Sequence, residues 1–356
     1  MRTILLNPGP VTLSARVRAA LARPDLCHRE SEFAMLQDGL RRKLLAVENL
    51  DATTWAAVLL TGSGTAAVEA MLVSCVPADG RVLVIENGVY GERMQRICAA
   101  YGIDHARVHG GWGEAIDVDA VRAALAAARY THVAVVHHET TTGRLNDLAA
   151  LAAVCRDSGA RLLVDGVSSF GAETIEFDRW GLDACAATAN KCLHGVPGTA
   201  FVVLRRAALA AAPARGVYLN LADYLARQDA HGTPFTQSVQ TFYALDEALD
   251  EFFEAGGRAA RHALFTSRMR RIRSHLEQLR VRGMLPAAEC SCVLHGFELP
   301  AGRTYAVLHD ALKARGFIIY AGQGALSEQV FRISAMGDIG EDDLARLETA
   351  LSDVLA

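Results

Sequence analysis

The sequence predicts an α/β protein with a large domain, built on a mostly parallel β-sheet, and a smaller C-terminal α/β domain. Strand and helix patterns alternate from about residue 56 to 205, which is the order that gives a parallel sheet flanked by helices. A second strand–helix pattern fills the last third of the chain. With 356 residues, the chain is long enough for two cores. We therefore expect an N-terminal arm (1–15), a large domain (16–250) and a small domain (251–356).

The N-terminal segment is expected to be an extended arm. Residues 7–10 read Asn-Pro-Gly-Pro and cannot be helical, because proline lacks an amide hydrogen and fixes its own backbone angle. A short helix is predicted over residues 15–22. A longer helix is predicted from about residue 31 to Val47, where apolar residues recur at helical spacing. An arm of this kind commonly covers a cleft.

The loop after the first predicted strand is a candidate anion site. The strand at 58–60 runs into Gly62-Ser63-Gly64-Thr65, where a helix begins. Free backbone N–H groups at a helix start favour a phosphate, and the Ser63 and Thr65 hydroxyls add donors. A dinucleotide-binding loop is the rival interpretation, but Ala67 stands where its third glycine is needed. The sequence therefore favours a single phosphate.

Two further predicted strands end in side chains that a ligand could use. Tyr90 follows the strand at 81–86 and either stacks on a ring or packs on the next helix. The strand at 131–136 ends in HHETTTG, where Thr140 either offers its hydroxyl to a ligand or caps the turn. His137 or His138 either lines the pocket or is a buried, satisfied histidine, and we expect the second.

The stretch from 162 to 201 carries the strongest chemical signal. An apolar strand ends at Asp165, and Lys191 follows in a turn before the strand at 200–204. A pyridoxal phosphate (PLP) enzyme needs a lysine that forms a Schiff base and a carboxylate that pairs with the pyridinium nitrogen. In the alternative interpretation, Asp165 caps a turn and Lys191 is a solvated charge. The small and apolar neighbours of Lys191 favour PLP, because desolvation lowers a lysine pKa.

The rest of the chain is predicted to form an irregular stretch at 206–240, two long helices and a final α/β unit. The helices run from 238 to 254 and onward to 282. The last unit has strands at 292–297, 317–320 and 330–333 and helices at 305–315 and 341–355. Arg332 lies within an apolar strand and needs an anionic partner, either a structural carboxylate or a substrate anion.

The composition excludes several kinds of partner. The net charge is −4 and no basic run is present, so neither a nucleic acid nor a membrane surface is expected as a partner. The eight cysteines form no Cys-x-x-Cys pair, which favours reduced thiols in the cytoplasm. No metal site is expected.

Nine stretches together resemble the fold-type I PLP enzymes of the class V aminotransferase family, over nearly the whole chain. They are LLNPGPVTLS, CHRESEF, TGSGTAAVEAML, NGVYGERM, HHETTTGRLN, VDGVSSFG, TANKCLHGVPG, GFIIYAGQG and FRISAMGDIG. The likeness is strongest to the subgroup that transaminates 2-aminoethylphosphonate with pyruvate. It implies a seven-stranded-type sheet, PLP as cofactor, a small amino donor with a 2-oxo acid as substrates, and a homodimer.

The resemblance also implies roles for single residues. Lys191 would be the Schiff-base lysine and Asp165 the pyridinium partner. The remaining cofactor contacts would come from Ser63, Gly64, Thr65 and Asn190 at the phosphate, Tyr90 over the ring and Thr140 at the ring hydroxyl. Thr236 and Thr233 would reach the phosphate of the neighbouring subunit, and Arg332 would hold the substrate anion.

The chain departs from the family pattern at His138, Ala321 and residues 334–336, and in the turn at 233–238. These positions lie on the expected substrate side, so other donors stay open. The alternatives are an alanine– or serine–glyoxylate transaminase and one that acts on a related aminophosphonate. A desulfurase is disfavoured, because Cys290 and Cys292 lead into a predicted strand rather than a mobile loop. A PLP-binding regulatory protein is disfavoured because Lys191 and Asp165 are both present.

Overall fold

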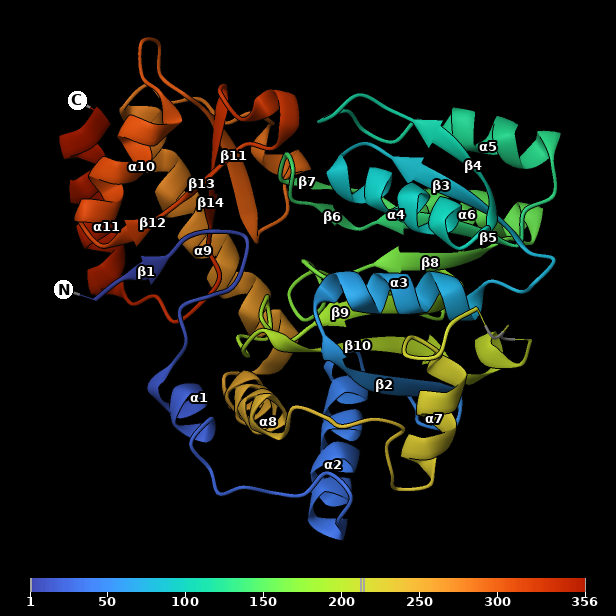
Figure 1. The fold of residues 1–356 in the computed structure, drawn as a ribbon. Helices are drawn as coiled ribbons and strands as arrows, with labels where there is room; N and C mark the ends of the chain where they lie inside the picture. Colours follow the sequence, from blue (N-terminus) through green and yellow to red (C-terminus); the bar gives the residue numbers. More distant parts are fainter. Residues whose placement is uncertain (1, 212, 214, 356) are drawn as a thin grey trace.

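The computed structural model describes residues 2–211, 213 and 215–355. Its centre is a seven-stranded sheet in the order β2-β10-β9-β8-β5-β3-β4 (Figure 1). The strands are β2 (Trp55–Gly62), β10 (Gly198–Arg205), β9 (Leu182–Thr188), β8 (Arg161–Asp165), β5 (His132–Val136), β3 (Arg81–Glu86) and β4 (Asp104–His109). Only β10 runs against its neighbours, because it follows β9 directly without a crossover helix. The predicted mostly parallel sheet is confirmed.

Helices cover both faces of this sheet. One face packs against α2 (Ser31–Val47), α5 (Val118–Ala127), α6 (Leu148–Ser158) and α8 (Val239–Glu254). The other packs against α3 (Gly64–Cys75), α4 (Val89–Ala100) and α7 (Leu221–Asp229). Within β2, Ala57 and Leu59 enter the first core while Val58 and Leu60 enter the second, as the two-residue period of a strand requires. Burial on both faces explains the continuous apolar strands.

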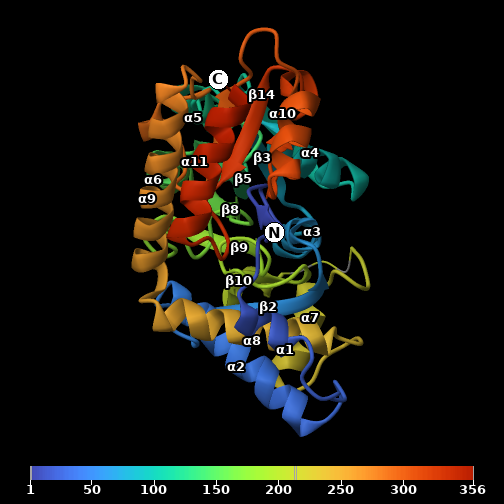
Figure 2. The ribbon, with the colours of Figure 1, turned by 90° about the vertical axis from the view of Figure 1, so that its left-hand side faces the viewer.

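The C-terminal part has its own sheet and core. β11 (Leu294–Glu298), β14 (Val330–Ser334) and β13 (Tyr320–Ala321) pair in antiparallel fashion. α9 (Gly257–Gln278), α10 (Tyr305–Ala314) and α11 (Glu341–Leu355) pack around them. Figure 2 shows α9 running along one side of the molecule, from α8 up to this C-terminal part. The division between residues 250 and 251 stays a prediction.

The N-terminal arm joins the C-terminal part. β1 (Ile4–Leu5) pairs in parallel with β12 (Phe317–Ile318), and Ser334 N donates to Leu6 O at 2.7 Å. A short helix, α1 (Ala15–Ala20), then leads back toward α8 (Figure 1). The arm thus runs from the C-terminal part to the helices under the large sheet.

Several predicted elements differ from the structure. The stretch predicted to be irregular at 206–240 contains α7, which Asn220 caps by accepting from two backbone N–H groups. The single strand predicted at 317–320 is two short strands, because β12 pairs with the arm and β13 pairs with β14. A two-stranded hairpin of β6 (His138–Glu139) and β7 (Arg144–Leu145) follows β5. Within the described residues, no helix is long and apolar enough to cross a membrane.

Candidate active site

A cavity of about 320 Å³ lies at the carboxyl ends of β2, β8 and β9. It brings together most of the residues that the sequence singles out: Ser63, Gly64, Thr65, Tyr90, Asp165, Asn190 and Lys191. These residues come from four separate strand–loop units. They meet because β2, β3, β8 and β9 all point toward the same edge of the sheet.

One end of the cavity is built to receive an anion. Ser63 is the N-cap of α3, and its side chain makes no capping hydrogen bond, so the hydroxyl stays free for a ligand. A Cβ atom at Gly64 would lie 2.8 Å from Cγ1 of Val167, so only glycine allows the start of α3 to lie this close to Val167. Arg93 Nη1 donates to Thr65 Oγ1 at 3.1 Å and brings a positive charge to the same end.

Arg93 lines the cavity, although no role was predicted for it from the sequence. It lies one turn after Tyr90 on α4, and its guanidinium carbon is 4.6 Å from the centre of the Tyr90 ring. Its position three residues after Tyr90 on the same helix could have indicated that Arg93 faces the cavity. The stacking holds both side chains at the cavity wall.

Asp165 is buried in this cavity and Lys191 is half-buried, and loss of solvent around both groups shifts both pKa values toward the neutral forms. Burial lowers the pKa of Lys191 to about 8, against smaller opposing effects of Cys192 and Asp165. Burial raises the pKa of Asp165 to about 6, although its carboxylate accepts from Val167 N at 3.0 Å. An acid and a base with converging pKa values in one cavity are typical of a catalytic site.

The two other lysines of the chain have ordinary surroundings. Lys43 forms ion pairs with Asp246 and Asp250, each at 2.6 Å, and Lys313 is exposed on α10. Among the three lysines in the sequence, Lys191 is therefore the one whose pKa is lowered by desolvation.

Two buried polar atoms near this region have no partner in the described part of the chain: Thr140 Oγ1 and His138 Nε2. The expectation of a satisfied histidine therefore holds for His137, which contacts Ser169 Oγ at 3.0 Å, but is wrong for Nε2 of His138. A buried polar atom without a partner is costly unless a ligand supplies one.

Arg332 is buried on β14 and makes no ion pair with any described carboxylate. Nη1 donates to Thr140 O at 2.7 Å and Nε donates to Ala321 O at 2.8 Å. Burial lowers its pKa. The structural salt bridge considered above is thus not formed, and the charge remains available to an anion next to the Thr140 loop.

Four predicted residues do not line the cavity: Thr140 and Arg332, described above, and Thr233 and Thr236. Thr233 is buried, and its hydroxyl accepts from Gln237 Nε2 at 3.0 Å and donates to Phe235 O at 3.3 Å. Thr236 is exposed. Their contact with a neighbouring subunit stays a prediction.

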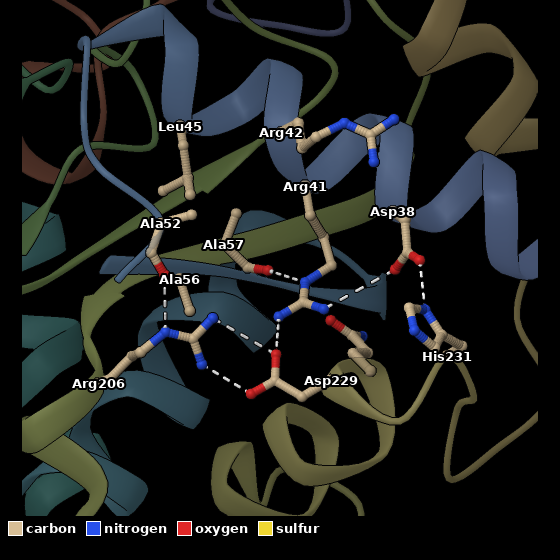
Figure 3. A pocket seen from close by; sticks show the side chains of 11 residues that line it. Asp38, Arg41, Arg42, Leu45, Ala52, Ala56, Ala57, Arg206, Asp229 and His231 are labelled. Atoms are coloured by element: carbon tan, nitrogen blue, oxygen red, sulfur yellow. Dashed lines mark hydrogen bonds and ion pairs between the residues drawn. The ribbon is translucent and has the colours of Figure 1, made fainter. Parts of the chain in front are cut away.

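A separate hollow of about 300 Å³ between α2, β2 and α7 has no comparable chemistry (Figure 3). Asp229 pairs with Arg41 at 2.6 Å and with Arg206 at 2.7 Å, and Asp38 pairs with His231 at 2.6 Å. These pairs are partly exposed, and pairs of this kind contribute little to stability.

The sheet order, the desolvated lysine and carboxylate, and the anion site at the start of α3 define a fold-type I PLP-dependent transferase. The family model described as "Aminotransferase class-V" matches residues 17–346. The chain belongs to this family.

Known relatives and structures agree with this assignment. A 2-aminoethylphosphonate–pyruvate transaminase of Aeromonas hydrophila is 38% identical over 94% of this chain and 90% of its own. One of Pseudomonas fluorescens is 37% identical over 99% and 96%. Aspartate aminotransferase of Thermus thermophilus superposes with a TM-score of 0.90, at 30% identity over 99% of both chains. Alanine–glyoxylate aminotransferase of Nostoc sp. has a TM-score of 0.91, at 26% identity over 100% and 96%.

Proposed function

We propose that this protein transfers the amino group of 2-aminoethylphosphonate to pyruvate with PLP, giving phosphonoacetaldehyde and alanine. The observation that carries the proposal is the 38% identity, over nearly the full chain, to a relative named for that reaction. The cavity that contains Lys191 and Asp165 supports the chemical class independently.

The residues of the cavity fit PLP. The start of α3 with Ser63, Gly64 and Thr65 would hold the phosphate, with Asn190 nearby and Arg93 as an added cation. Tyr90 would lie over the ring. The unpartnered Thr140 hydroxyl would meet the ring hydroxyl. When bound, PLP supplies an aldehyde that takes up the amino group and a ring that withdraws electrons.

Lys191 would have two tasks. Its amine tethers the cofactor aldehyde between turnovers, which requires the neutral form that burial favours. With the donor bound, the free amine of Lys191 would accept the proton from the donor's amine-bearing carbon and hold it for return to the reacting group. A pKa near 8 suits an amine that must both accept and give a proton near neutral pH.

Asp165 would hold the positive charge on the ring nitrogen. A buried carboxylate with a raised pKa gains most from a cationic partner, because the pair offsets its desolvation. With the nitrogen kept protonated, the site stabilises the negative charge that develops when the donor carbon loses its proton.

Arg332 would bind the phosphonate. 2-Aminoethylphosphonate has no carboxylate on its amine-bearing carbon, so the distant phosphonate is its one anionic group. Arg332 has no protein carboxylate as partner among the described residues, and its hydrogen bond to Thr140 O links the substrate side to the cofactor side.

We also propose a homodimer in which Thr233 and Thr236 reach the neighbouring cofactor phosphate. The eight unpaired cysteines support a cytoplasmic location.

A donor panel tests the substrate assignment. The purified protein would be assayed with pyruvate and 2-aminoethylphosphonate, and with glyoxylate and alanine or serine. We expect kcat/KM to be highest for 2-aminoethylphosphonate. A higher value for alanine or serine with glyoxylate would favour the alternative, which is supported by the similarity to the Nostoc structure.

A further inference from the structure

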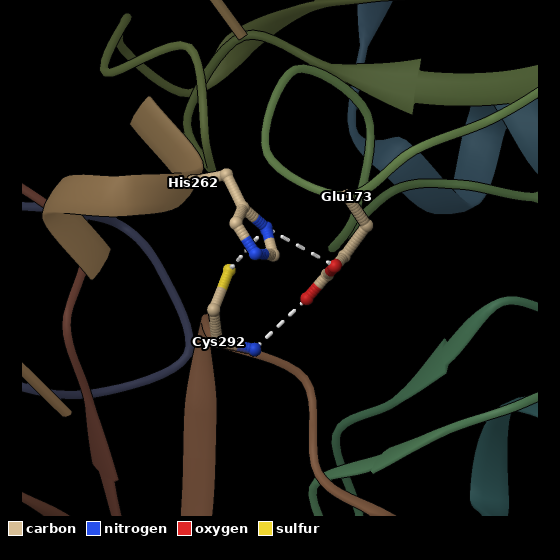
Figure 4. Close-up of side chains that lie close together, drawn as sticks. All are labelled: Glu173, His262 and Cys292. Carbon is tan, nitrogen blue, oxygen red and sulfur yellow. Dashed lines mark hydrogen bonds and ion pairs between the residues drawn. The ribbon is translucent and has the colours of Figure 1, made fainter. Parts of the chain in front are cut away.

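A second chemical cluster lies outside the active-site cavity. Glu173, His262 and Cys292 converge at the edge of a cavity of about 640 Å³ (Figure 4). Glu173 comes from the loop after β8, His262 from α9 and Cys292 from the residues just before β11. The three segments are far apart in sequence, so the fold alone brings these side chains together.

The distances within the cluster match those around a small cation. His262 Nδ1 lies 3.4 Å from Glu173 Oε2 and 3.5 Å from Cys292 Sγ, and each of the three residues offers a ligand atom within 4.8 Å of the others. Zinc bonds of roughly 2.0–2.3 Å in a tetrahedron place neighbouring ligand atoms about 3.3–3.8 Å apart. The two contacts to His262 therefore have the length of tetrahedral edges.

The carboxylate is held in place before any ion arrives. Glu173 Oε1 accepts from Ser291 Oγ at 2.7 Å and from Cys292 N at 2.8 Å, which leaves Oε2 directed at the cluster. Glu173 is buried, whereas His262 is partly exposed beside the open cavity. The site thus has a fixed interior ligand and a route for ion entry.

A cysteine–histidine–glutamate relay for nucleophilic catalysis does not fit the geometry. Such a relay needs the thiol on one ring nitrogen and the carboxylate on the other. Here both Cys292 and Glu173 face Nδ1 of His262, and Ala172 O lies 3.2 Å from the same nitrogen. A cation that replaced the proton on Nδ1 would meet the thiol and the carboxylate at the same point.

We propose that Glu173, His262 and Cys292 form a binding site for a zinc-class divalent cation, with water from the cavity as the fourth ligand. Binding places the histidine proton on Nε2 and releases the thiol proton to solvent. Thiolate, imidazole and carboxylate together favour Zn²⁺ over Mg²⁺ or Ca²⁺. The bound ion would tie α9 and the start of β11 to the loop that follows β8.

Metal binding tests the site on the holoenzyme. After treatment with a chelator, the wild type and the variants His262→Ala, Cys292→Ser and Cys290→Ser would be dialysed against Zn²⁺. Bound metal would be measured by inductively coupled plasma mass spectrometry. Cys290 is the matched control, because it lines the same cavity but lies outside the cluster, with Sγ 3.4 Å from Pro286 O.

We expect one equivalent of Zn²⁺ on the wild type and on Cys290→Ser, with at least tenfold weaker binding to His262→Ala and Cys292→Ser. Zn²⁺ should raise the Tm of the first two proteins alone. Because His262 is partly exposed, its variant is expected to fold, and its transaminase activity should be retained. Equal Zn²⁺ binding by all four proteins, or none by the wild type, would overturn the proposal and leave the proposed transamination untouched.

Discussion

Nζ of Lys191 donates a hydrogen bond to the carbonyl oxygen of Pro8. The amine at the centre of the active-site cavity is thus in contact with the N-terminal arm, more than 180 residues away in sequence. The same arm pairs with β12 through β1. The arm therefore links the lysine to the C-terminal part, where Arg332 lies.

The close approach of the arm makes Gly9 a critical position. Gly9 has φ +104°, and a Cβ atom there would lie 2.7 Å from Cδ of Lys191. We expect Gly9→Ala to displace the lysine or the arm, to cost about 1–3 kcal/mol of stability and to lower kcat/KM at least tenfold. Urea unfolding and steady-state kinetics would measure the two effects.

Gly102 offers a matched control for this substitution. It also has a positive φ, +63°, but a Cβ atom there meets nothing within 4 Å. Gly102→Ala should cost about 1 kcal/mol through backbone strain alone and leave kcat/KM unchanged. Equal kinetic losses in both variants would show that the arm does not constrain Lys191.

The pKa of Lys191 sets the pH dependence of cofactor attachment. With a pKa of about 8, the neutral fraction of the amine rises about fivefold from pH 7 to 8 and levels off above about pH 9. Stopped-flow absorbance of PLP uptake by the cofactor-free protein should follow this curve. A rate that still rises tenfold per pH unit up to pH 10 would show that the lysine keeps its ordinary pKa.

The sign of the linked effect on stability follows from the lowered pKa. The folded state disfavours the charged amine, so Lys191 destabilises the cofactor-free protein below about pH 8. This penalty disappears as pH rises toward 10.5, the ordinary value.

Asp165→Asn should separate function from stability. The pKa of Asp165 is raised from 3.8 to about 6, so its ionisation costs the cofactor-free fold about 2–3 kcal/mol at pH 7.5. The penalty is absent below pH 3.8 and complete above pH 6. Asparagine removes this charge and can still accept from Val167 N.

We therefore expect cofactor-free Asp165→Asn to be more resistant to urea than the wild type at pH 7.5, while kcat falls by about 10²–10³ through loss of the ring-nitrogen partner. The exposed Asp119, on α5, gives a control in Asp119→Asn. A kcat close to the wild-type value in Asp165→Asn would remove this residue from the mechanism.

Thr140→Val tests the unpartnered hydroxyl. Because Thr140 Oγ1 has no partner among the described residues, its removal should leave the stability of the cofactor-free protein unchanged or raise it by about 1 kcal/mol. If this hydroxyl meets the cofactor, the Kd for PLP should rise about 5–20-fold. Titration of cofactor-free protein with PLP, followed by fluorescence, would measure it. An unchanged Kd would show that the hydroxyl does not contact the cofactor.

The sequence predicted the elements with strong local patterns. The helix at 341–355 and the strand at 81–86 have the predicted bounds. The anion loop was recognisable because its glycines, its hydroxyls and the helix start are contiguous. The location of the cavity was predictable because parallel strands end at the same edge of the sheet.

Features that depend on distant contacts were not predictable. Helix α7 has only 9 residues, so its apolar pattern repeats too few times to distinguish a helix from the irregular residues around it. Arg93 gains its role from Thr65 on another helix. The orphaned Nε2 of His138 and the cluster of Glu173, His262 and Cys292 arise from packing between segments that are separated by many residues.

Mapping the attachment site of the cofactor tests most directly the proposal that Lys191 binds PLP. Holoenzyme would be reduced with borohydride and digested, and its peptides mapped by mass spectrometry. The chain has three lysines, Lys43, Lys191 and Lys313, so the assignment is unambiguous. We expect one pyridoxyl group, on the peptide that contains Lys191, and none on Lys191→Ala. A label on Lys43 or Lys313 instead, or a Lys191→Ala protein that keeps both its visible absorbance and its activity, would contradict this proposal.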